Sequence, residues 1–347
     1  MAPTTQKVWT VAGKTKGFAE LSLKEAEVPK VGDYEVLVKL EGASLNYRDL
    51  IIPQGKYPFP LDLPVVPGSD GAGTVVEVGS KVTRFQKGDK VVTLFNQGHL
   101  YGPIDTHGSK TGLGGVYDGT LRQYGAFNEQ GLSLAPKNLN AVESATLTCA
   151  GLTAWNALYG LKPLKPGQTV LVQGTGGVSM FGLQFAKAAG ATVIATTSSP
   201  EKEAFLKKLG ADHVLNYKKD PKWGETARKL TPHGEGVDHV LEVGGPGTLE
   251  QSIKAIKFEG IISIIGFLGA GDPKGQPQIL DALSNICTIR GVYVGGRDLF
   301  EDMIRAIEIN NIHPIVDKEI FSLEKAKEAY EYQWAQKHLG KVGIKIE

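Results

Sequence analysis

A glycine-rich turn between a buried strand and a helix is the strongest constraint that this sequence places on its fold. Residues 169–173 are apolar or β-prone, and a helical pattern runs from 180 to 189. The turn between them contains Gly174, Thr175, Gly176, Gly177 and Val178. Backbone N–H groups in such a turn can approach a pyrophosphate at the positive end of the helix. The segment therefore predicts a nucleotide-binding turn, although Ser179 stands where a third glycine is usual.

Strand and helix patterns alternate through the second half of the chain. Strands are predicted at residues 169–173, 192–196, 213–216, 239–242, 261–265 and 288–294. Helices are predicted at residues 144–158, 180–189, 200–209, 248–255, 299–310 and 323–336. This order is typical of an α/β fold with a doubly wound parallel sheet.

The first part of the chain has a different pattern, with short predicted strands in place of alternating strands and helices. Between residues 7 and 127, short strand patterns such as 35–40, 73–78 and 90–94 are broken by Gly and Pro, which indicates an antiparallel β domain. A last strand at 341–346 is expected to return to that domain. We therefore predict a catalytic, substrate-binding domain at residues 1–135 and 297–347, and a nucleotide-binding domain at 136–296.

Composition excludes several classes of function. The formal net charge of +1 gives no global attraction to nucleic acid or anionic membranes. No apolar run is long enough to cross a bilayer, the N-terminus lacks a secretory signal, and two cysteines do not suggest a disulfide scaffold. We expect a cytoplasmic protein with a small-molecule substrate and neither a nucleic-acid nor a membrane partner.

One segment resists assignment. Residues 96–119 contain seven glycines and two histidines with little periodicity. A loop of this length is either a lid or binding loop, or a solvated excursion, and the sequence leaves both readings open. His99, Asp105 and His107 could in principle bind a metal there, but such side chains in a polar loop are usually solvated.

The end of the second strand bears on the cofactor. An acidic residue about twenty positions after the first glycine usually binds the adenosine ribose, but this chain has hydroxyl side chains there, including Ser198 and Ser199. Hydroxyls together with Lys202 and the phenol of Tyr217 suit a 2′-phosphate, which favours NADP(H) over NAD(H). The alternative is an ordinary strand-to-helix turn in which Ser199 caps the helix.

Three further residues follow later strands at the edge of the parallel sheet where ligands bind. Gly244, Gly266 and Phe267 are expected to contact the nicotinamide half of the cofactor. Turn chemistry alone would also explain the two glycines. Arg297 could reach the cofactor, but a surface position is the favoured interpretation.

Several motifs occur together in an order that is specific to one superfamily. They are Asn46-Tyr47-Arg48-Asp49, Gly55-Lys56-Tyr57-Pro58, Pro67-Gly68-Ser69-Asp70, Gly88-Asp89-Lys90-Val91, Cys149-Ala150-Gly151-Leu152 and Leu339-Gly340-Lys341-Val342. The chain resembles the medium-chain dehydrogenase/reductase superfamily over nearly its whole length. The first two motifs look like its zinc-independent quinone-oxidoreductase and enoyl-reductase branch. The resemblance implies a GroES-like antiparallel catalytic domain beside a Rossmann domain.

The same resemblance places the catalytic zinc ligands of the zinc-dependent relatives at Asn46, Ser69 and Cys149. One soft ligand of three does not suit zinc, which needs about three protein ligands. Residues 96–119 also lack the four cysteines of the relatives' structural zinc lobe. We expect no bound metal, and Cys149 to be a small buried side chain.

Without zinc, a hydrogen-bond donor must stabilise charge that develops on the substrate oxygen. The resemblance puts Tyr57 at the position of a tyrosine that faces the nicotinamide, and a neutral phenol is a good donor. Asn46 could orient the substrate or the nicotinamide ribose. The alternatives are packing for Tyr57 and a structural hydrogen bond for Asn46, while Arg48 and Asp49 are expected to form an ion pair or a cap.

The leading hypothesis is NADPH-dependent hydride transfer to an activated C=C bond of an enone, quinone or enoyl substrate. A carbonyl reductase or alcohol dehydrogenase acting on C=O is the nearest alternative, and a non-catalytic NADPH-binding protein is another. The resemblance also implies a homodimer that pairs through residues 288–294 at the sheet edge.

Overall fold

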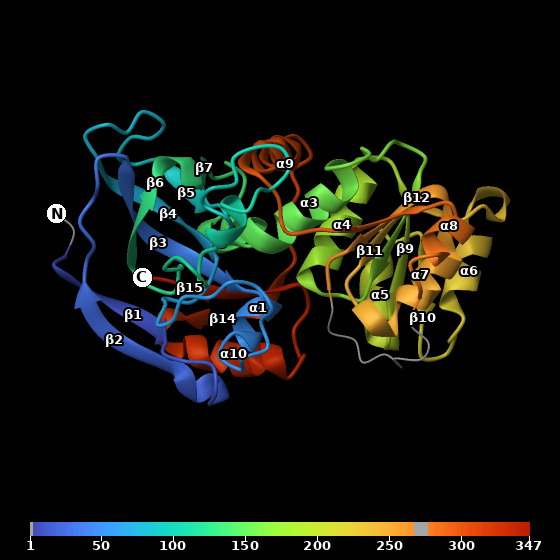
Figure 1. Cartoon of the computed structure of the whole chain (residues 1–347), viewed down its shortest axis with the longest axis horizontal. Helices are drawn as coiled ribbons and strands as arrows, with labels where there is room; N and C mark the ends of the chain where they lie inside the picture. The colour runs from blue at the N-terminus through green and yellow to red at the C-terminus, as the bar shows by residue number, and fades with distance from the viewer. Residues whose placement is uncertain (1–2, 267–276) are drawn as a thin grey trace. The chain divides into compact units, whose positions relative to one another are not determined.

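A computed structural model describes residues 3–266 and 277–347 of the chain (Figure 1). The chain divides into two compact units. One contains residues Met1–Leu152 and Gly295–Glu347 and is called the antiparallel unit; the other contains Thr153–Val294 and is called the parallel unit. The first division lies at Leu152 and not at the expected 135/136, because residues 136–152 pack with the antiparallel unit.

The antiparallel unit is built from a two-stranded hairpin and a seven-stranded sheet. Its strands are β1 (Thr5–Val11), β2 (Leu21–Glu27), β3 (Glu35–Leu45), β4 (Asp70–Val78), β5 (Lys90–Thr93), β6 (Tyr124–Asn128), β7 (Leu132–Leu134), β14 (Val316–Ser322) and β15 (Lys341–Lys345). The order is β14-β15-β3-β4-β5-β7, with β6 also paired to β3. The predicted return of the last strand is confirmed, because β15 pairs antiparallel with β3, Gly343 opposite Ser44.

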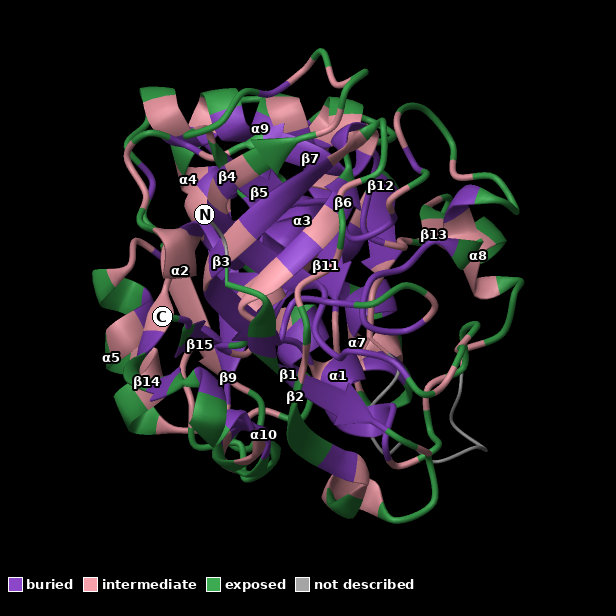
Figure 2. Ribbon diagram, turned by 90° about the vertical axis from the view of Figure 1, so that its left-hand side faces the viewer, coloured by how far each residue is buried: buried purple, intermediate pink, exposed green. Residues whose placement is uncertain are grey.

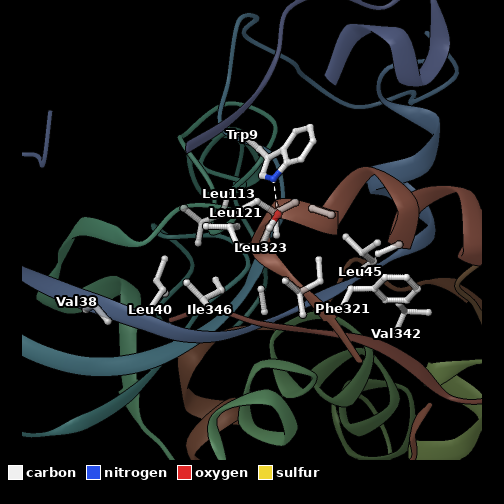
Figure 3. Close-up of a cluster of buried hydrophobic side chains, with 14 of the residues drawn as sticks. Trp9, Val38, Leu40, Leu45, Leu113, Leu121, Phe321, Leu323, Val342 and Ile346 are labelled. Atoms are coloured by element: carbon white, nitrogen blue, oxygen red, sulfur yellow. Dashed lines mark hydrogen bonds between the residues drawn. The ribbon is translucent and has the colours of Figure 1, made fainter. Parts of the chain in front are cut away.

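Helices cover this sheet, and the core lies between them. They are α1 (Tyr47–Ile51), α2 (Ala141–Ala145), α9 (Arg297–Ile309) and α10 (Ala326–Trp334). In Figure 3 the Trp9 indole packs above the core, and its N–H donates to the carbonyl of Leu323 at 2.6 Å. Leu40 and Val342 are among the fully buried side chains below it. Burial of such apolar side chains is the main stabilising term for this unit.

The parallel unit has the predicted doubly wound architecture. Its strands are β8 (Thr169–Gln173), β9 (Thr192–Thr197), β10 (His213–Asn216), β11 (Val237–Glu242), β12 (Ile256–Ile264) and β13 (Thr288–Gly291). They run parallel in the order β10-β9-β8-β11-β12-β13, which is the Rossmann order 3-2-1-4-5-6. All five residues of β8 are buried, as its apolar composition predicts.

Helices flank the parallel sheet. They are α3 (Leu152–Tyr159), α4 (Gly177–Ala188), α5 (Pro200–Lys208), α6 (Trp223–Lys229), α7 (Leu249–Ala255) and α8 (Asp281–Ser284). In Figure 2 the central strands are buried along their length, whereas α5 is largely exposed or half-buried. The sequence prediction did not include α6, a short helix that begins at the buried Trp223.

Two predicted elements differ in the structure. The helix expected at 144–158 is divided, because a π-helical turn at Leu147–Gly151 separates α2 from α3. The strand expected at 288–294 ends at Gly291, and Val294 lies beyond it with a φ of 55° and a buried side chain. The apolar alternation of Ile289, Val292 and Val294 is therefore not the alternation of one strand.

Candidate active site

The glycine turn has the geometry that its sequence predicts. β8 ends at Gln173, Gly174 adopts a left-handed φ of 73°, and Gly176 is the N-cap of α4. A Cβ atom added at Gly174 or Gly176 would meet no atom within 4 Å. Packing within the protein therefore does not require a glycine at 176, whereas close approach of a phosphate to the backbone would.

The glycine that allows close packing between helix and sheet lies further along α4 than in the usual pattern. Ser179 occupies the expected position, and its hydroxyl donates to the carbonyl of Gln173 at 2.6 Å. At Gly182, one turn later, an added Cβ would collide with Leu241 and lie 3.3 Å from Val172. Gly182 thus provides the close helix–strand packing that the third glycine provides elsewhere, and its signal was a glycine inside a helical pattern.

The structure brings together the four residues proposed for the 2′-phosphate end of the cofactor. β9 and β10 are neighbours, and the Tyr217 N–H donates to the carbonyl of Thr197 at 3.0 Å. Ser198 and Ser199 follow directly on β9, and Ser199 caps α5 by accepting from the Lys202 N–H at 3.3 Å. Ser199 therefore has the capping role of the alternative interpretation, and Ser198 lies beside it directly after β9.

A buried carboxylate network fixes the loop after β11. One carboxylate oxygen of Glu242 accepts the backbone N–H groups of Gly244 and Gly245 at 2.9 and 2.8 Å, and the other accepts the Gln173 amide at 2.8 Å. The Gln173 amide oxygen accepts from Gly244 N–H at 3.1 Å. Sequence reasoning missed Gln173 and Glu242, whose only signal was a polar residue at the end of each of two buried strands.

The other predicted contacts at this edge have structural explanations. An added Cβ at Gly244 would collide with Thr248, and one at Gly266 would collide with the carbonyl of Val243. Both glycines are therefore required by packing, whatever else they contact. Phe267 lies outside the described residues.

In the antiparallel unit, Asn46 is held by a buried lysine. The Lys341 ammonium donates to Asn46 Oδ1 at 2.5 Å and to the carbonyl of Leu45 at 2.6 Å, and it pairs with Asp70 at 3.0 Å. The Asn46 amide donates to Ser69 Oγ at 3.4 Å. Lys341 and Asp70 are 3% and 0% exposed, so this is a desolvated ion pair. Sequence reasoning missed Lys341, which lies 295 positions after Asn46.

The donor set around Asn46 does not fit a zinc ion. The Asn46 oxygen already accepts an ammonium group, and Ser69 donates to Asp70 at 2.9 Å. Burial raises the pKa of the partly buried Cys149 thiol to about 12, with a further rise from Asp70. Asn46 and Ser69 stand at two of the three ligand positions, and an amide and a hydroxyl are not the soft ligands that zinc prefers. Across residues 3–266 and 277–347 no three His, Cys, Asp or Glu side chains are placed to hold a metal.

Tyr57 lies against Arg48 of α1, the short helix that begins after Asn46. The Arg48 Nε–H donates to the Tyr57 hydroxyl at 3.3 Å, and the Arg48 guanidinium carbon is 5.0 Å from the centre of the Tyr57 ring. Asp49 caps α1 by accepting the Asn46 N–H at 2.8 Å, which confirms the expected cap. Burial raises the pKa of the Asp49 carboxyl to about 6, and the Arg48 charge opposes that rise.

Residues 96–119 are not a solvated excursion throughout. Their inner part, residues 111–115, is buried, and the outer part from 101 to 106 is mostly exposed. The His99 ring bonds to the carbonyl of Gly102 at 2.8 Å, and Asp105 accepts the Gly108 N–H at 2.6 Å. Arg297, proposed as a possible cofactor contact, donates to Gln130 at 2.5 Å within the antiparallel unit.

Similarity to known proteins shows the family of the chain. Residues 32–137 match the alcohol dehydrogenase GroES-like domain, and residues 177–308 match the zinc-binding dehydrogenase family. A zinc-type alcohol dehydrogenase-like protein of Schizosaccharomyces pombe is 51% identical over 344 residues, which cover 98% of this chain and 99% of that protein. The chain belongs to the medium-chain dehydrogenase/reductase superfamily.

Solved structures of this superfamily share the whole fold. An NAD-dependent alcohol dehydrogenase is 31% identical with a TM-score of 0.87, covering 98% of this chain and 100% of that one. Crotonyl-CoA carboxylase/reductase is 25% identical with a TM-score of 0.83, covering 99% and 89%. The predicted superfamily and its α/β and GroES-like architecture are confirmed, and the protein is an oxidoreductase of that superfamily. No helix in the described ranges is long and apolar enough to cross a membrane.

Proposed function

We propose that this medium-chain dehydrogenase/reductase is a zinc-independent, NADPH-dependent reductase of an activated C=C bond in an enone, quinone or enoyl substrate. The observation that carries the proposal is the Lys341 ammonium on Asn46 Oδ1. In the zinc-dependent relatives a metal ligand occupies the position of Asn46. Here the amide oxygen of Asn46 accepts a hydrogen bond from the Lys341 ammonium group instead. A neutral donor must then stabilise the substrate oxygen.

Tyr57 is the proposed donor. NADPH held at the glycine turn would supply the hydride that reduces the β-carbon of the substrate. Tyr57 would donate a hydrogen bond to the carbonyl oxygen, where negative charge develops, and a proton from solvent water would reach the α-carbon to give the saturated product. Asn46 Nδ2, oriented by Lys341 and Ser69, supplies a second polar contact for the substrate.

NADPH is the proposed cofactor because of the side chains at the ends of β9 and β10. Gly174, Gly176 and the start of α4 would hold the pyrophosphate. Ser198, Lys202 and Tyr217 would hold the 2′-phosphate, where a carboxylate would repel it. Two further lysines follow Tyr217. The hydrogen bond and charge of Lys207 are the main causes that lower the pKa of Glu203 in α5, and the charge of Lys219 adds a smaller effect in the same direction.

A carbonyl reductase or alcohol dehydrogenase is the second candidate. It is favoured by the alcohol dehydrogenase names of the relatives. Both reactions need the same donor and cofactor, so only the product distinguishes them.

The test is NADPH consumption with an enone and with its saturated ketone, followed by identification of the products. We expect turnover of the enone, and turnover of only the saturated ketone would contradict the first candidate. Tyr57→Phe should lower kcat by about 10²- to 10⁴-fold with the NADPH Kd unchanged. Tyr101→Phe, at a tyrosine 77% exposed in the loop at 96–119, is the matched control.

Zinc independence has its own test. Elemental analysis of the purified protein should find substoichiometric zinc, and chelation should leave the activity intact. Stoichiometric zinc that is removed together with the activity would refute this part of the proposal.

We also propose a homodimer that pairs through β13, an edge strand of the parallel sheet. Light scattering after size-exclusion chromatography should give twice the mass of the chain. Ile289→Pro removes a backbone N–H from that edge and should shift the mass toward the monomer.

A further inference from the structure

The Arg48 guanidinium forms the expected ion pair with Asp49, but its hydrogen bonds go to other groups. Its Nη1 is 3.7 Å from Asp49 Oδ1, which is too long for a hydrogen bond. Instead, Nη1 donates to the carbonyl of Leu113 at 2.7 Å, and Nε donates to Tyr57 Oη at 3.3 Å. Arg48 is 9% exposed; its bond to Leu113 is buried and its bond to Tyr57 is partly buried.

Phe95 and the glycine-rich loop that follows it hold the Arg48 side chain in place. The Phe95 ring centre lies 4.6 Å from the guanidinium carbon, in cation–π contact. An added Cβ at Gly115 would lie 2.7 Å from Arg48 Nη2, so the absence of a side chain there leaves room for the guanidinium. The φ of Gly115 is not in the left-handed region, so conformation alone does not require a glycine there.

The direction of the bond to Tyr57 has a chemical consequence. A guanidinium carries N–H donors and no acceptor, so the bond uses a lone pair of the phenol oxygen and not its proton. The nearby cation also stabilises negative charge on that oxygen as the phenol donates to an acceptor.

We propose that Arg48 is a positioning residue for Tyr57, and that the buried part of the loop, residues 111–115, fixes Arg48 for this purpose. The proposal rests on the donor role of Tyr57 proposed above. It gives residues 96–119 a function that is independent of metal binding: together with the neighbouring Phe95, they orient the donor of the reaction through Leu113 and Gly115.

The test is a double-mutant cycle between Arg48→Met and Tyr57→Phe, read out as kcat, KM and NADPH Kd. Methionine keeps the length of the apolar stem and removes the charge and all N–H donors. Arg48→Met should lower kcat by about 10- to 100-fold, the range of one charge-assisted hydrogen bond, with NADPH Kd and KM nearly unchanged. In the Tyr57→Phe background the same substitution should cause little further loss.

Three results would overturn the proposal. An equal loss from Arg48→Met in both backgrounds would show that Arg48 acts independently of Tyr57. An unchanged kcat in Arg48→Met, with Tyr57→Phe impaired, would refute the role of Arg48 and leave the proposed function standing. An unchanged kcat in Tyr57→Phe would refute the proposed donor and this inference together.

Gly115→Ala tests whether the loop positions Arg48, and it leaves both Arg48 and Tyr57 unaltered. It is also the variant to use if Arg48→Met does not fold. Its methyl group should displace the guanidinium and lower kcat by about tenfold, with no further loss in the Tyr57→Phe background. The matched control is Gly108→Ala in the same loop, where the new Cβ would be 3.2 Å from Asp105 Oδ1 and remote from Arg48. Folded Gly115→Ala protein with the kcat of the control would overturn the role of the loop.

Discussion

The parallel unit assembles its candidate ligand site from backbone, whereas the antiparallel unit assembles its site from buried charged side chains. In the parallel unit, Gly174 and Gly176 present the turn between one strand and the next helix. In the antiparallel unit, Asn46, Asp70 and Lys341 come from three distant stretches of the chain. The difference follows from the chemistry, because a phosphate can be bound by backbone N–H groups, while a developing charge on a substrate needs placed side chains.

The comparison also teaches how each unit tolerates buried polarity. Glu242 in the parallel unit is satisfied by backbone N–H, amide and hydroxyl groups. Asp70 in the antiparallel unit is satisfied by an ammonium group and two serine hydroxyls. A buried ion pair depends on both partners, so the antiparallel unit should be the more sensitive to loss of a single charge.

The largest effect on stability is expected at that ion pair. Lys341→Met leaves Asp70 buried without its counter-charge and should lower the free energy of unfolding by about 3–5 kcal/mol in urea denaturation. Adding Asp70→Asn should restore part of this loss. Lys345→Met on the same strand, where the side chain is 65% exposed, should cost less than about 1 kcal/mol. Equal losses at both lysines would contradict the ion-pair interpretation.

The next expected effect is a pH dependence of the unfolding free energy that differs between the two units. Burial lowers the pKa of His239 in the parallel unit to about 4. The unfolded chain therefore binds a proton near pH 6.5 that the native state does not, so stability falls as the pH drops from about 6.5 to 4, by up to about 3 kcal/mol. His239→Gln should remove this component from the unfolding free energy measured across that range. An unchanged pH dependence would show that the ring is not buried as a neutral group.

Asp49 should act with the opposite sign in the antiparallel unit. Its folded pKa of about 6 lies above the ordinary value, so between about pH 4 and 6 the native state binds the additional proton. Its contribution is present below about pH 4 and is lost as the pH rises to about 6, by up to about 3 kcal/mol. Asp49→Asn keeps an acceptor for the Asn46 N–H, and its unfolding free energy relative to the original protein should rise across this window. A constant difference would refute the raised pKa.

The smallest effect separates packing from binding within one helix. Gly182→Ala should cost about 1–3 kcal/mol of stability, because its methyl group collides with Leu241, and NADPH affinity should change little. Gly176→Ala should change stability by less than about 0.5 kcal/mol and weaken NADPH binding by about tenfold or more. Thermal unfolding and NADPH fluorescence titration measure the two effects, and the reverse pattern would mean that the roles of the glycines are exchanged.

Most of the parallel unit could be predicted from the sequence. Hydrophobic runs and glycine turns are local signals, so the strand bounds at 169–173 and 213–216 match the structure residue for residue. The helix after Ser199 begins where its cap and Pro200 place it. The π-helical turn at Leu147–Gly151 was not predictable in this way, because its residues fit an ordinary helical pattern.

The sequence by itself determined the class of fold, the glycine turn between β8 and α4, and the residues Asn46, Ser69 and Cys149 at the positions where the resemblance places zinc ligands. Only the tertiary structure decided that Lys341 holds Asn46 and that Arg48, which pairs with Asp49 at 3.7 Å, donates hydrogen bonds to Tyr57 and Leu113. Periodicity and capping are set by neighbours within a few positions, and they are read from the chain directly. The hydrogen bond between Lys341 and Asn46, 295 positions apart, is set by how strands β3 and β15 meet, and that register exists only in the folded protein.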